Sequence, residues 1–344
     1  MRAIVIDEFS SLPQLRDIVP PTAPADGVVI RVEATGVCRS DHHAWLGHDP
    51  TISLPHVPGH ELVGWIDSAG PEVAKFSAGQ RVTVPFVCGC GSCRWCLGGN
   101  AQVCPDQTQP GFTHYGSWAE KVVIHSADAN LVAVPDDLPA ASLVGLGCRF
   151  ATAFHGLEVR AKLSPGESVA VFGCGGVGLS AIMIAHAVGA EIIALDVNDA
   201  ALERAREYGA SHTINAAGLK WQELAAEVVA QTSGGAAVTV DALGREDTIR
   251  AAISSLAPLG RHVQIGLLAE PPVLDMPRVI ALELSVLGSH GMAATEYPPM
   301  LDLVVQGRLR PQDLVTNVIR LEDAPEALRA LGENRQTGMT IIEL

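Results

Sequence analysis

The chain is poor in aromatic and basic side chains, and it has no long apolar run. Aromatic residues make up 4% of its 344 residues, and 23 lysines and arginines stand against 38 aspartates and glutamates, a formal net charge of −15. Such an acidic protein repels phosphate groups, so we expect neither a nucleic-acid partner nor an anionic membrane partner. No apolar stretch reaches the roughly 18 residues that a membrane-spanning helix needs. Small molecules remain as the expected ligands.

A cleavable signal pattern is also missing, and residues 1–6 are typical of a first β-strand instead. Eight cysteines in such a chain indicate reduced thiols that bind metal rather than disulfides. We therefore expect a cytoplasmic protein. Its length is typical of two domains, and the lack of repeats and of a flexible linker favours domains that pack closely.

The local pattern changes near residue 150. Before it, short β-type runs are punctuated by glycine and proline, which is typical of an antiparallel barrel-like domain. From residue 168 to about 287, expected strands and helices alternate, and this predicts a parallel sheet covered by helices. We expect strands over 168–172, 191–195, 237–240 and 261–265 and helices over 177–188 and 200–208. After residue 288 the pattern is mixed again.

Four cysteines form one cluster on a glycine-rich loop. Two, two and seven residues separate Cys90, Cys93, Cys96 and Cys104. Four thiolates without an open position are typical of a structural zinc site, which orders a loop that burial alone could not fold. An iron–sulfur cluster is the main alternative, because the spacing partly resembles ferredoxin and Pro105 follows the last cysteine. The repeated ferredoxin unit is missing, so the spacing favours zinc.

A second candidate metal site is spread along the chain. Cys38, His60 and Cys148 offer two thiolates and one imidazole, and they leave the fourth tetrahedral position to water or substrate, as catalytic zinc requires. An alcohol bound there would lose its proton near neutral pH, and the alkoxide could expel a hydride. Asp41 is the residue type that receives the second ring N–H of a metal-bound histidine.

Two residues close to Cys38 suggest a proton path. Ser40 can pass the alcohol proton outward through its hydroxyl, and His43 can act as the solvent-side base. A single histidine is weak evidence for a site, so the other histidines are interpreted as ordinary surface or core residues. These include His42, His48, His56, His125 and His290.

A glycine-rich turn lies between an expected strand and an apolar helix, the context that a dinucleotide-binding turn demands. Its residues are Gly173, Cys174, Gly175, Gly176, Val177 and Gly178. Backbone N–H groups and the positive helix end would meet the pyrophosphate there. Asp196 closes the next expected strand, where a carboxylate binds both ribose hydroxyls and favours NAD. Cys174 is interpreted as a small space-filler and Cys88 as a spare thiol.

These motifs together resemble the zinc-dependent alcohol dehydrogenases of the medium-chain dehydrogenase/reductase family, essentially from end to end. The resemblance rests on residues 38–45 (CRSDHHAW), residues 59–61 (GHE), the four-cysteine loop, Cys148 and the turn at 173–178. It implies an α/β protein with a GroES-like β-barrel catalytic domain, residues 1–150 and 288–344, that carries both zinc sites. Residues 151–287 would form a Rossmann NAD-binding domain, with the active site in the cleft.

The resemblance also implies a function. A primary or secondary alcohol would be oxidised reversibly to an aldehyde or ketone, with NAD as acceptor and two zinc ions per chain. Glu61 would lie behind the catalytic zinc and swing in as a ligand during exchange, Arg39 would contact the pyrophosphate, Thr152 the nicotinamide, and Phe86 the substrate. Leu243, Ile265 and Leu267 would line the cofactor groove. A homo-oligomer, a tetramer rather than a dimer, is implied as well.

The chain departs from the family at two positions. Many relatives carry a basic residue where this chain has Ala201, although Arg204 follows on the same expected helix, and many carry an arginine that reaches the pyrophosphate where it has Met339. Both differences weaken phosphate contacts, so cofactor affinity is expected to be lower than usual.

Two other functions stay open. A polyol or threonine-type dehydrogenase has the same fold, but polyol enzymes usually carry a glutamate in place of Cys148. A non-catalytic regulator that binds zinc and nucleotide should lack some of the family's catalytic residues, whereas all of them are present in this chain.

Overall fold

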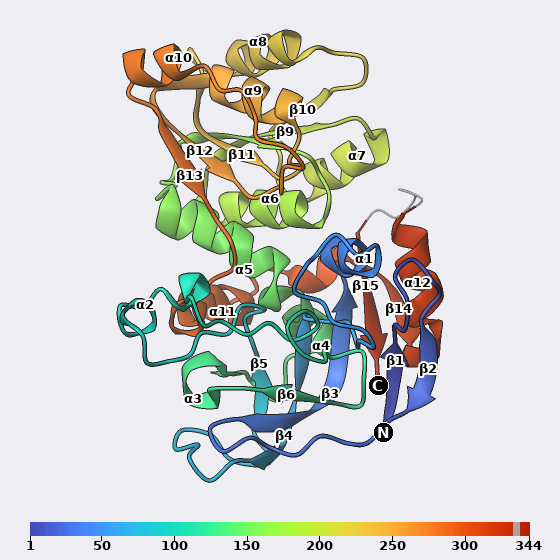
Figure 1. Cartoon of the computed structure of the whole chain (residues 1–344). Helices are drawn as coiled ribbons and strands as arrows, with labels where there is room; N and C mark the ends of the chain where they lie inside the picture. The colour runs from blue at the N-terminus through green and yellow to red at the C-terminus, as the bar shows by residue number, and fades with distance from the viewer. Residues whose placement is uncertain (333–337) are drawn as a thin grey trace. The chain divides into compact units, whose positions relative to one another are not determined.

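The computed structural model of the chain describes residues 1–332 and 338–344, and it divides into two compact units (Figure 1). The first unit contains residues 1–151 and 291–344, and the second contains residues 152–290. Both ends of the chain therefore build the first unit. No helix within the described residues is long and apolar enough to cross a membrane.

The first unit is built on a seven-stranded sheet in the order β14-β15-β3-β4-β5-β7, with β6 also paired to β3. Within the described part of the chain, β14 and β15 are parallel and the other neighbours are antiparallel. The strands are β3 (Val28–Val37), β4 (Leu62–Ala69), β5 (Arg81–Thr83), β6 (Lys121–Ile124), β7 (Val132–Ala133), β14 (Val315–Arg320) and β15 (Met339–Glu343). A separate antiparallel ribbon joins β1 (Arg2–Val5) to β2 (Gln14–Asp17).

Strand β3 organises this unit. Its sequence VVIRVEATGV is rich in β-branched residues, and most of its side chains are buried. Ile30, Leu62 and Ile124 come from three neighbouring strands and are fully buried in one apolar cluster. Because this cluster fixes the sheet, the end of β3 carries Cys38 to a defined place.

Short helices connect these strands. They are α1 (Arg39–Trp45), α2 (Arg94–Leu97), α3 (Ala127–Asn130), α4 (Ala140–Leu143), α11 (Tyr297–Val305) and α12 (Ala324–Leu331), with 3-10 turns η1 (Ala101–Val103), η2 (Val144–Gly147), η4 (Ala294–Glu296), η5 (Pro311–Leu314) and η6 (Leu321–Asp323). Helix α5 (Arg149–Phe154) begins directly after Cys148 and leads into the second unit.

The second unit contains a six-stranded parallel sheet in the order β10-β9-β8-β11-β12-β13. Its strands are β8 (Ser168–Phe172), β9 (Glu191–Asp196), β10 (His212–Asn215), β11 (Ala236–Asp241), β12 (Leu256–Gln264) and β13 (Ser285–Gly288). Numbered within the unit, this is the order 3-2-1-4-5-6 of a dinucleotide-binding Rossmann sheet. Ligands bind such sheets where the strand order reverses, here between β8 and β11.

Helices cover both faces of the parallel sheet. Figure 1 shows α6 and α7 on one face and α8 and α9 on the other. The helices are α6 (Gly176–Val188), α7 (Asp199–Glu207), α8 (Trp221–Gln231), α9 (Glu246–Ser254) and α10 (Met276–Ala281), with one π-helical segment, η3 (His155–Arg160). The apolar helix α6 is buried along most of its length, so its N-terminus is held firmly at the end of β8.

Candidate active site

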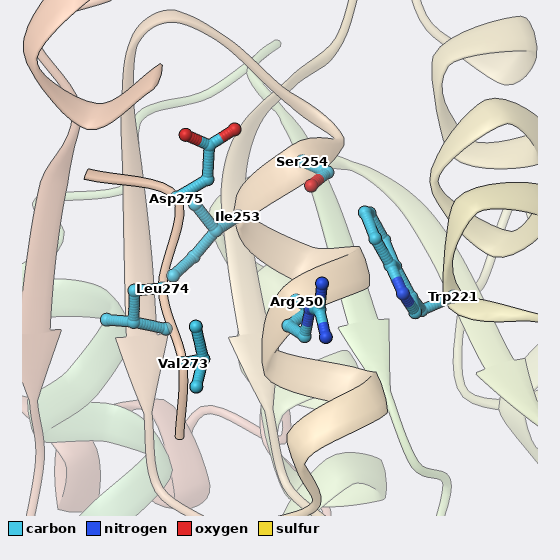
Figure 2. A pocket seen from close by; sticks show the side chains of 7 residues that line it. All are labelled: Trp221, Arg250, Ile253, Ser254, Val273, Leu274 and Asp275. Atoms are coloured by element: carbon cyan, nitrogen blue, oxygen red, sulfur yellow. The ribbon is translucent and has the colours of Figure 1, made fainter. Parts of the chain in front are cut away.

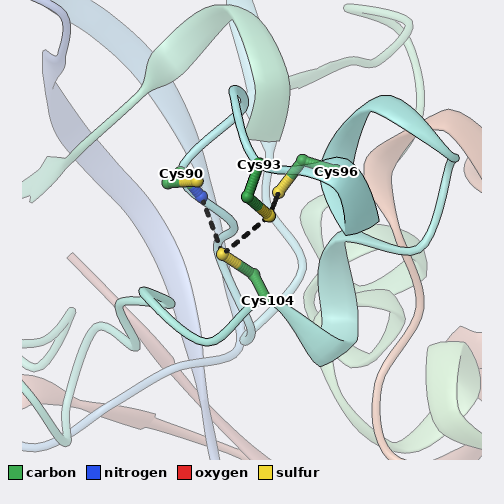
Figure 3. Close-up of side chains that lie close together, drawn as sticks. All are labelled: Cys90, Cys93, Cys96 and Cys104. Atoms are coloured by element: carbon green, nitrogen blue, oxygen red, sulfur yellow. Dashed lines mark hydrogen bonds between the residues drawn. The ribbon is translucent and has the colours of Figure 1, made fainter.

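The four-cysteine loop folds into a compact thiol cluster (Figure 3). The sulfur atoms of Cys90, Cys93, Cys96 and Cys104 all lie within 4.8 Å of one another. Cys93 Sγ is 3.6 Å from Cys96 Sγ and 3.7 Å from Cys104 Sγ. Thiolates at about 2.3 Å from a tetrahedral zinc ion lie about 3.8 Å apart, so the cluster fits zinc.

The thiols of this cluster differ strongly in acidity. Hydrogen bonds from the backbone and side chain of Ser92 lower the pKa of Cys90 to about 6. Burial raises the pKa of Cys96 to about 12. Thiolates packed this closely repel one another, and a bound dication removes that repulsion and the remaining protons. The donor set therefore suits a metal ion that is held by thiolates alone.

The second ligand set also comes together. One ligand atom each from Cys38, His60 and Cys148 lies within 4.8 Å of the others. Cys38 follows β3 and is the N-cap of α1, His60 precedes β4, and Cys148 precedes α5, so three separate segments converge. This set of two sulfur atoms and one nitrogen atom fits a zinc ion with one position left open.

Asp41 orients the histidine of this set. Its buried Oδ1 lies 3.0 Å from His60 Nδ1, and its Oδ2 accepts the backbone N–H of Cys38 at 2.9 Å. With a carboxylate at Nδ1, the ring proton is assigned to that nitrogen and Nε2 is left for a metal. Ser40 Oγ lies 3.5 Å from His60 Nε2 and 3.2 Å from Cys38 Sγ, so it borders the same position.

The three residues of this set differ in how readily they lose a proton. A hydrogen bond from Cys148 lowers the pKa of Cys38 well below its ordinary value, against the effect of burial. The same hydrogen bond, together with burial, raises the pKa of Cys148. Burial lowers the pKa of His60, but the Asp41 carboxylate raises it overall. A metal ion must displace protons from Cys148 and His60, so its affinity falls as the pH falls.

Glu61 lies beside this ligand set and not within it. Its fully buried carboxylate is paired with Arg149, with 2.6 Å between Glu61 Oε2 and Arg149 Nη2. The sequence motifs did not single out Arg149, although it directly follows Cys148. Position next to a ligand was the signal that could have found it.

Two aromatic rings frame the imidazole of His60. The ring of Phe86 lies 6.0 Å from it, centroid to centroid, and the ring of Phe112 lies 5.2 Å from it. Both phenylalanines are more than nine-tenths buried. The resemblance predicted Phe86, but Phe112 belongs to no motif.

The outer residues of the predicted proton path lie on α1. His43 Nδ1 is 3.3 Å from His48 Nδ1, so His48, interpreted from the sequence as ordinary, is a direct neighbour of the predicted base. Burial and the charge of His48 lower the pKa of His43 from its ordinary value of 6.5. Arg39, predicted to contact pyrophosphate, donates from Nη1 to the backbone oxygen of Leu331 at 3.0 Å.

The glycine turn of the second unit has the predicted geometry. It joins the end of β8 to α6, with Gly175 as N-cap. Gly173 has φ +97°, a conformation that favours glycine. A Cβ on Gly178 would lie 1.7 Å from the carbonyl oxygen of Gly173, so neither position accepts a side chain. Asp196 ends β9 and accepts the backbone N–H of Cys174 at 2.7 Å. The turn and the predicted ribose-binding acid are therefore adjacent.

Three of the other predicted cofactor residues lie just after strands of this unit, and Thr152 lies in α5. Leu243 follows β11, and Ile265 and Leu267 follow β12; Leu267 is 83% exposed. Thr152 is buried, and its backbone oxygen accepts the Ser289 hydroxyl at 2.7 Å. The exposed leucine leaves apolar surface for a ligand at this edge.

The two departures from the family pattern are both buried. Ala201 on α7 is 6% exposed and Met339 at the start of β15 is 1% exposed. At neither position does the chain offer a charge to a phosphate.

The thiols of Cys88 and Cys174 are buried as well, and burial raises the pKa of Cys88 to about 12, so both are unreactive.

A pocket of about 200 Å³ lies elsewhere in the second unit (Figure 2). Its lining comes from the start of α8, from α9 and from the loop before α10, and Arg250 stacks over the Trp221 ring at 4.6 Å. None of the predicted site residues lines it.

Comparisons with known proteins agree with this geometry. Residues 24–136 match the alcohol dehydrogenase GroES-like domain, and residues 176–306 match the zinc-binding dehydrogenase family. An alcohol dehydrogenase of Geobacillus stearothermophilus is 30% identical over 100% of this chain and 99% of its own length. A solved NAD-dependent alcohol dehydrogenase superposes with a TM-score of 0.90 at 30% identity, covering 100% of both chains.

A further solved relative, the Escherichia coli alcohol dehydrogenase rspB complexed with cofactor NADH, superposes with a TM-score of 0.88 at 26% identity, covering 100% of this chain and 99% of its own. The predicted α/β class, a GroES-like domain with a Rossmann domain, is confirmed. The chain therefore belongs to the zinc-dependent alcohol dehydrogenases of the medium-chain dehydrogenase/reductase family.

Proposed function

We propose that this chain catalyses the reversible, NAD-linked oxidation of a primary or secondary alcohol to an aldehyde or ketone at a zinc ion held by Cys38, His60 and Cys148. Membership of the family makes it an oxidoreductase that uses zinc and NAD. The observation that carries the assignment of the centre is the convergence of these three ligand atoms within 4.8 Å.

When bound, zinc supplies Lewis acidity at the alcohol oxygen and NAD accepts the hydride. Asp41 holds His60 in the tautomer that presents Nε2. Ser40 Oγ, between Cys38 Sγ and His60 Nε2, accepts the hydroxyl proton of the substrate. His43 is the solvent-side base that receives it. The rings of Phe86 and Phe112 exclude water from one side of the imidazole.

Reduction of NAD in the presence of graded alcohols tests this function. We expect turnover with simple primary or secondary alcohols and a kcat/KM that depends on chain length and branching. One methylene in an apolar pocket changes the preference by only about 1–3 kcal/mol, so the panel must be broad and include polyols. Turnover with polyols alone would assign the chain to the polyol-type enzymes instead.

Metal content is the second expected result. Two complete ligand sets predict about two zinc ions per chain by elemental analysis, one of them held by thiolates alone. Cys93→Ser should lower the content to about one and reduce the thermal stability, because a structural zinc ion contributes to folding. The matched control, Cys88→Ser, removes a thiol outside the cluster and should retain both ions. Iron in the cluster, or one zinc ion with full activity, would contradict the assignment.

His43→Ala should lower the rate mainly at acidic pH. The pKa of His43 lies below 6.5, so above that pKa the neutral ring is available as a base where hydroxide is scarce. We expect a loss on the order of tenfold near pH 6.5 that shrinks as the pH rises, because solvent then replaces the base. His212→Ala, an exposed histidine of the second unit, is the control. A loss that does not vary with pH would exclude this role.

We also propose a homo-oligomer, a tetramer rather than a dimer, in the cytoplasm. In support, β13 is an edge strand of the parallel sheet, and the side chains of Leu259, Ile280 and Val286 around it are 67%, 73% and 43% exposed. Exposed edges and apolar side chains favour association. All eight cysteines lie in the described part of the chain, and none forms a disulfide, which suits a reducing compartment. Light scattering measures the assembly directly.

A further inference from the structure

A buried ion pair, Glu61 with Arg149, lies directly against the proposed zinc ligands. Arg149 Nε donates to Glu61 Oε1 at 2.8 Å, and Arg149 Nη2 donates to Glu61 Oε2 at 2.6 Å. The two side chains are 5% and 0% exposed. Two parallel N–H···O bonds from one guanidinium fix both the position and the orientation of a carboxylate. Glu61 therefore has one defined place, and Arg149 sets it.

The pair connects all three segments that supply the ligands. Glu61 directly follows one ligand in the chain, and Arg149 directly follows another. Arg149 Nη2 also donates to the backbone oxygen of Val37, the residue before the third ligand, at 3.2 Å. Loss of the ion pair would therefore disturb the positions of the three ligand residues.

Met339, a second side chain close to Glu61, carries no charge. A methyl group added at Gly36 would lie 2.4 Å from Glu61 Oε2 and 3.2 Å from Met339 Cε, so both side chains border the same small space. A thioether cannot hold a carboxylate in place. Within the described residues, the cation paired with this carboxylate is Arg149.

We propose that Arg149 is a positioning residue that keeps the Glu61 carboxylate out of the zinc site, so that the fourth coordination position stays available to water or alcohol. This inference rests on the proposed function, because it requires a zinc ion on Cys38, His60 and Cys148. Carboxylate oxygens are good zinc ligands. An unrestrained Glu61, next to His60 in the chain, competes for the open position at high effective concentration. Pairing with Arg149 removes that competitor.

The test uses Co²⁺ in place of zinc and imidazole as the probe of the open position. Imidazole binding to the open site changes the visible absorption of Co²⁺, whereas a closed thiolate cluster does not respond. The unmodified protein should bind imidazole saturably. Arg149→Met should bind it about tenfold more weakly or worse, because Glu61 takes the position. The double variant Glu61→Gln with Arg149→Met should regain the original affinity, which a loosened fold would not.

Two further variants complete the experiment. Arg81→Met removes another buried arginine of the same unit, paired with Glu33, and should leave the imidazole affinity unchanged. Glu61→Gln alone should change it by less than about twofold, because the pair already keeps this carboxylate out. If Arg149→Met does not fold, Glu61→Gln can still overturn the inference, because much tighter imidazole binding would show that Glu61 occupies the open position despite Arg149.

Different results would reject the role of Arg149 and the open zinc site itself. Unchanged imidazole binding in Arg149→Met, or much tighter binding in Glu61→Gln, would overturn the role of Arg149 while leaving the zinc site in place. An unmodified protein that holds Co²⁺ but gives no response to imidazole would instead overturn the open zinc site itself.

Discussion

Replacing His60 by alanine should abolish alcohol oxidation while NAD binding is retained. In the proposed zinc site, His60 would supply the one nitrogen ligand, and Asp41 Oδ1 orients its ring from 3.0 Å. Losing the metal removes several kcal/mol of charge stabilisation, so kcat/KM should fall by about a thousandfold or more. NAD binding should persist, because the turn at 173–178 belongs to the other unit. The rate of NAD reduction measures the loss of alcohol oxidation, and titration calorimetry measures the binding of NAD.

The zinc content provides the control for this variant. It should fall from about two ions to about one per chain, because the four-cysteine cluster is intact. Cys38→Ser should behave in the same way, and His212→Ala should keep both metal and activity. If His60→Ala retained more than a few per cent of the rate, the open site could not be the catalytic centre.

The unmodified protein should prefer NAD to NADP by kcat/KM on the order of a hundredfold, about 2–3 kcal/mol. Asp196 ends β9 beside the glycine turn. A carboxylate at this place would accept hydrogen bonds from the ribose hydroxyls of NAD and repel a 2′-phosphate. Asp199 adds a second acid at the start of α7. Arg204, the nearest base along that helix, donates from Nη2 to the Tyr208 hydroxyl at 2.9 Å. Along α7, Arg204 is therefore engaged by Tyr208 and is not held free to receive the extra phosphate.

Substitution of Asp196 tests the cause of this preference. Asp196→Ser should lower the ratio mainly by weakening NAD, because the lost hydrogen bonds belong to the ribose. Asp199→Ser removes the neighbouring acid, which contacts Asn215, and should change the ratio far less. Equal use of both cofactors by the unmodified protein would show that Asp196 does not contact the ribose.

Features that depend on local spacing could be predicted from the sequence. The loop of Cys90 to Cys104 folds on itself, so four closely spaced thiols were enough to predict a cluster. The turn at Gly173–Gly178 lies between a strand and a helix that both show in the residue pattern. Strand β11 was expected over 237–240 and spans Ala236–Asp241, because its short run AAVTVD is rich in β-branched residues.

Features that depend on long-range packing could not be predicted in the same way. Arg149 and Glu61 are 88 residues apart, and neither spacing nor composition reveals that their charges meet. Phe112 lies far from His60 in the sequence, and their rings meet only because the loop that carries Phe112 packs against Gly59. Strand β13 has a mostly exposed pattern, which hides it from a search for buried runs.

An anomalous difference map, recorded at the zinc absorption edge from crystals of the purified protein, locates the metal ions themselves. We expect two peaks per chain, one inside the four-cysteine loop and one between Cys38 Sγ, His60 Nε2 and Cys148 Sγ. The second peak should have water, alcohol or an inhibitor as its remaining ligand. A single peak in the four-cysteine loop, in a protein that still oxidises alcohols, would contradict the account.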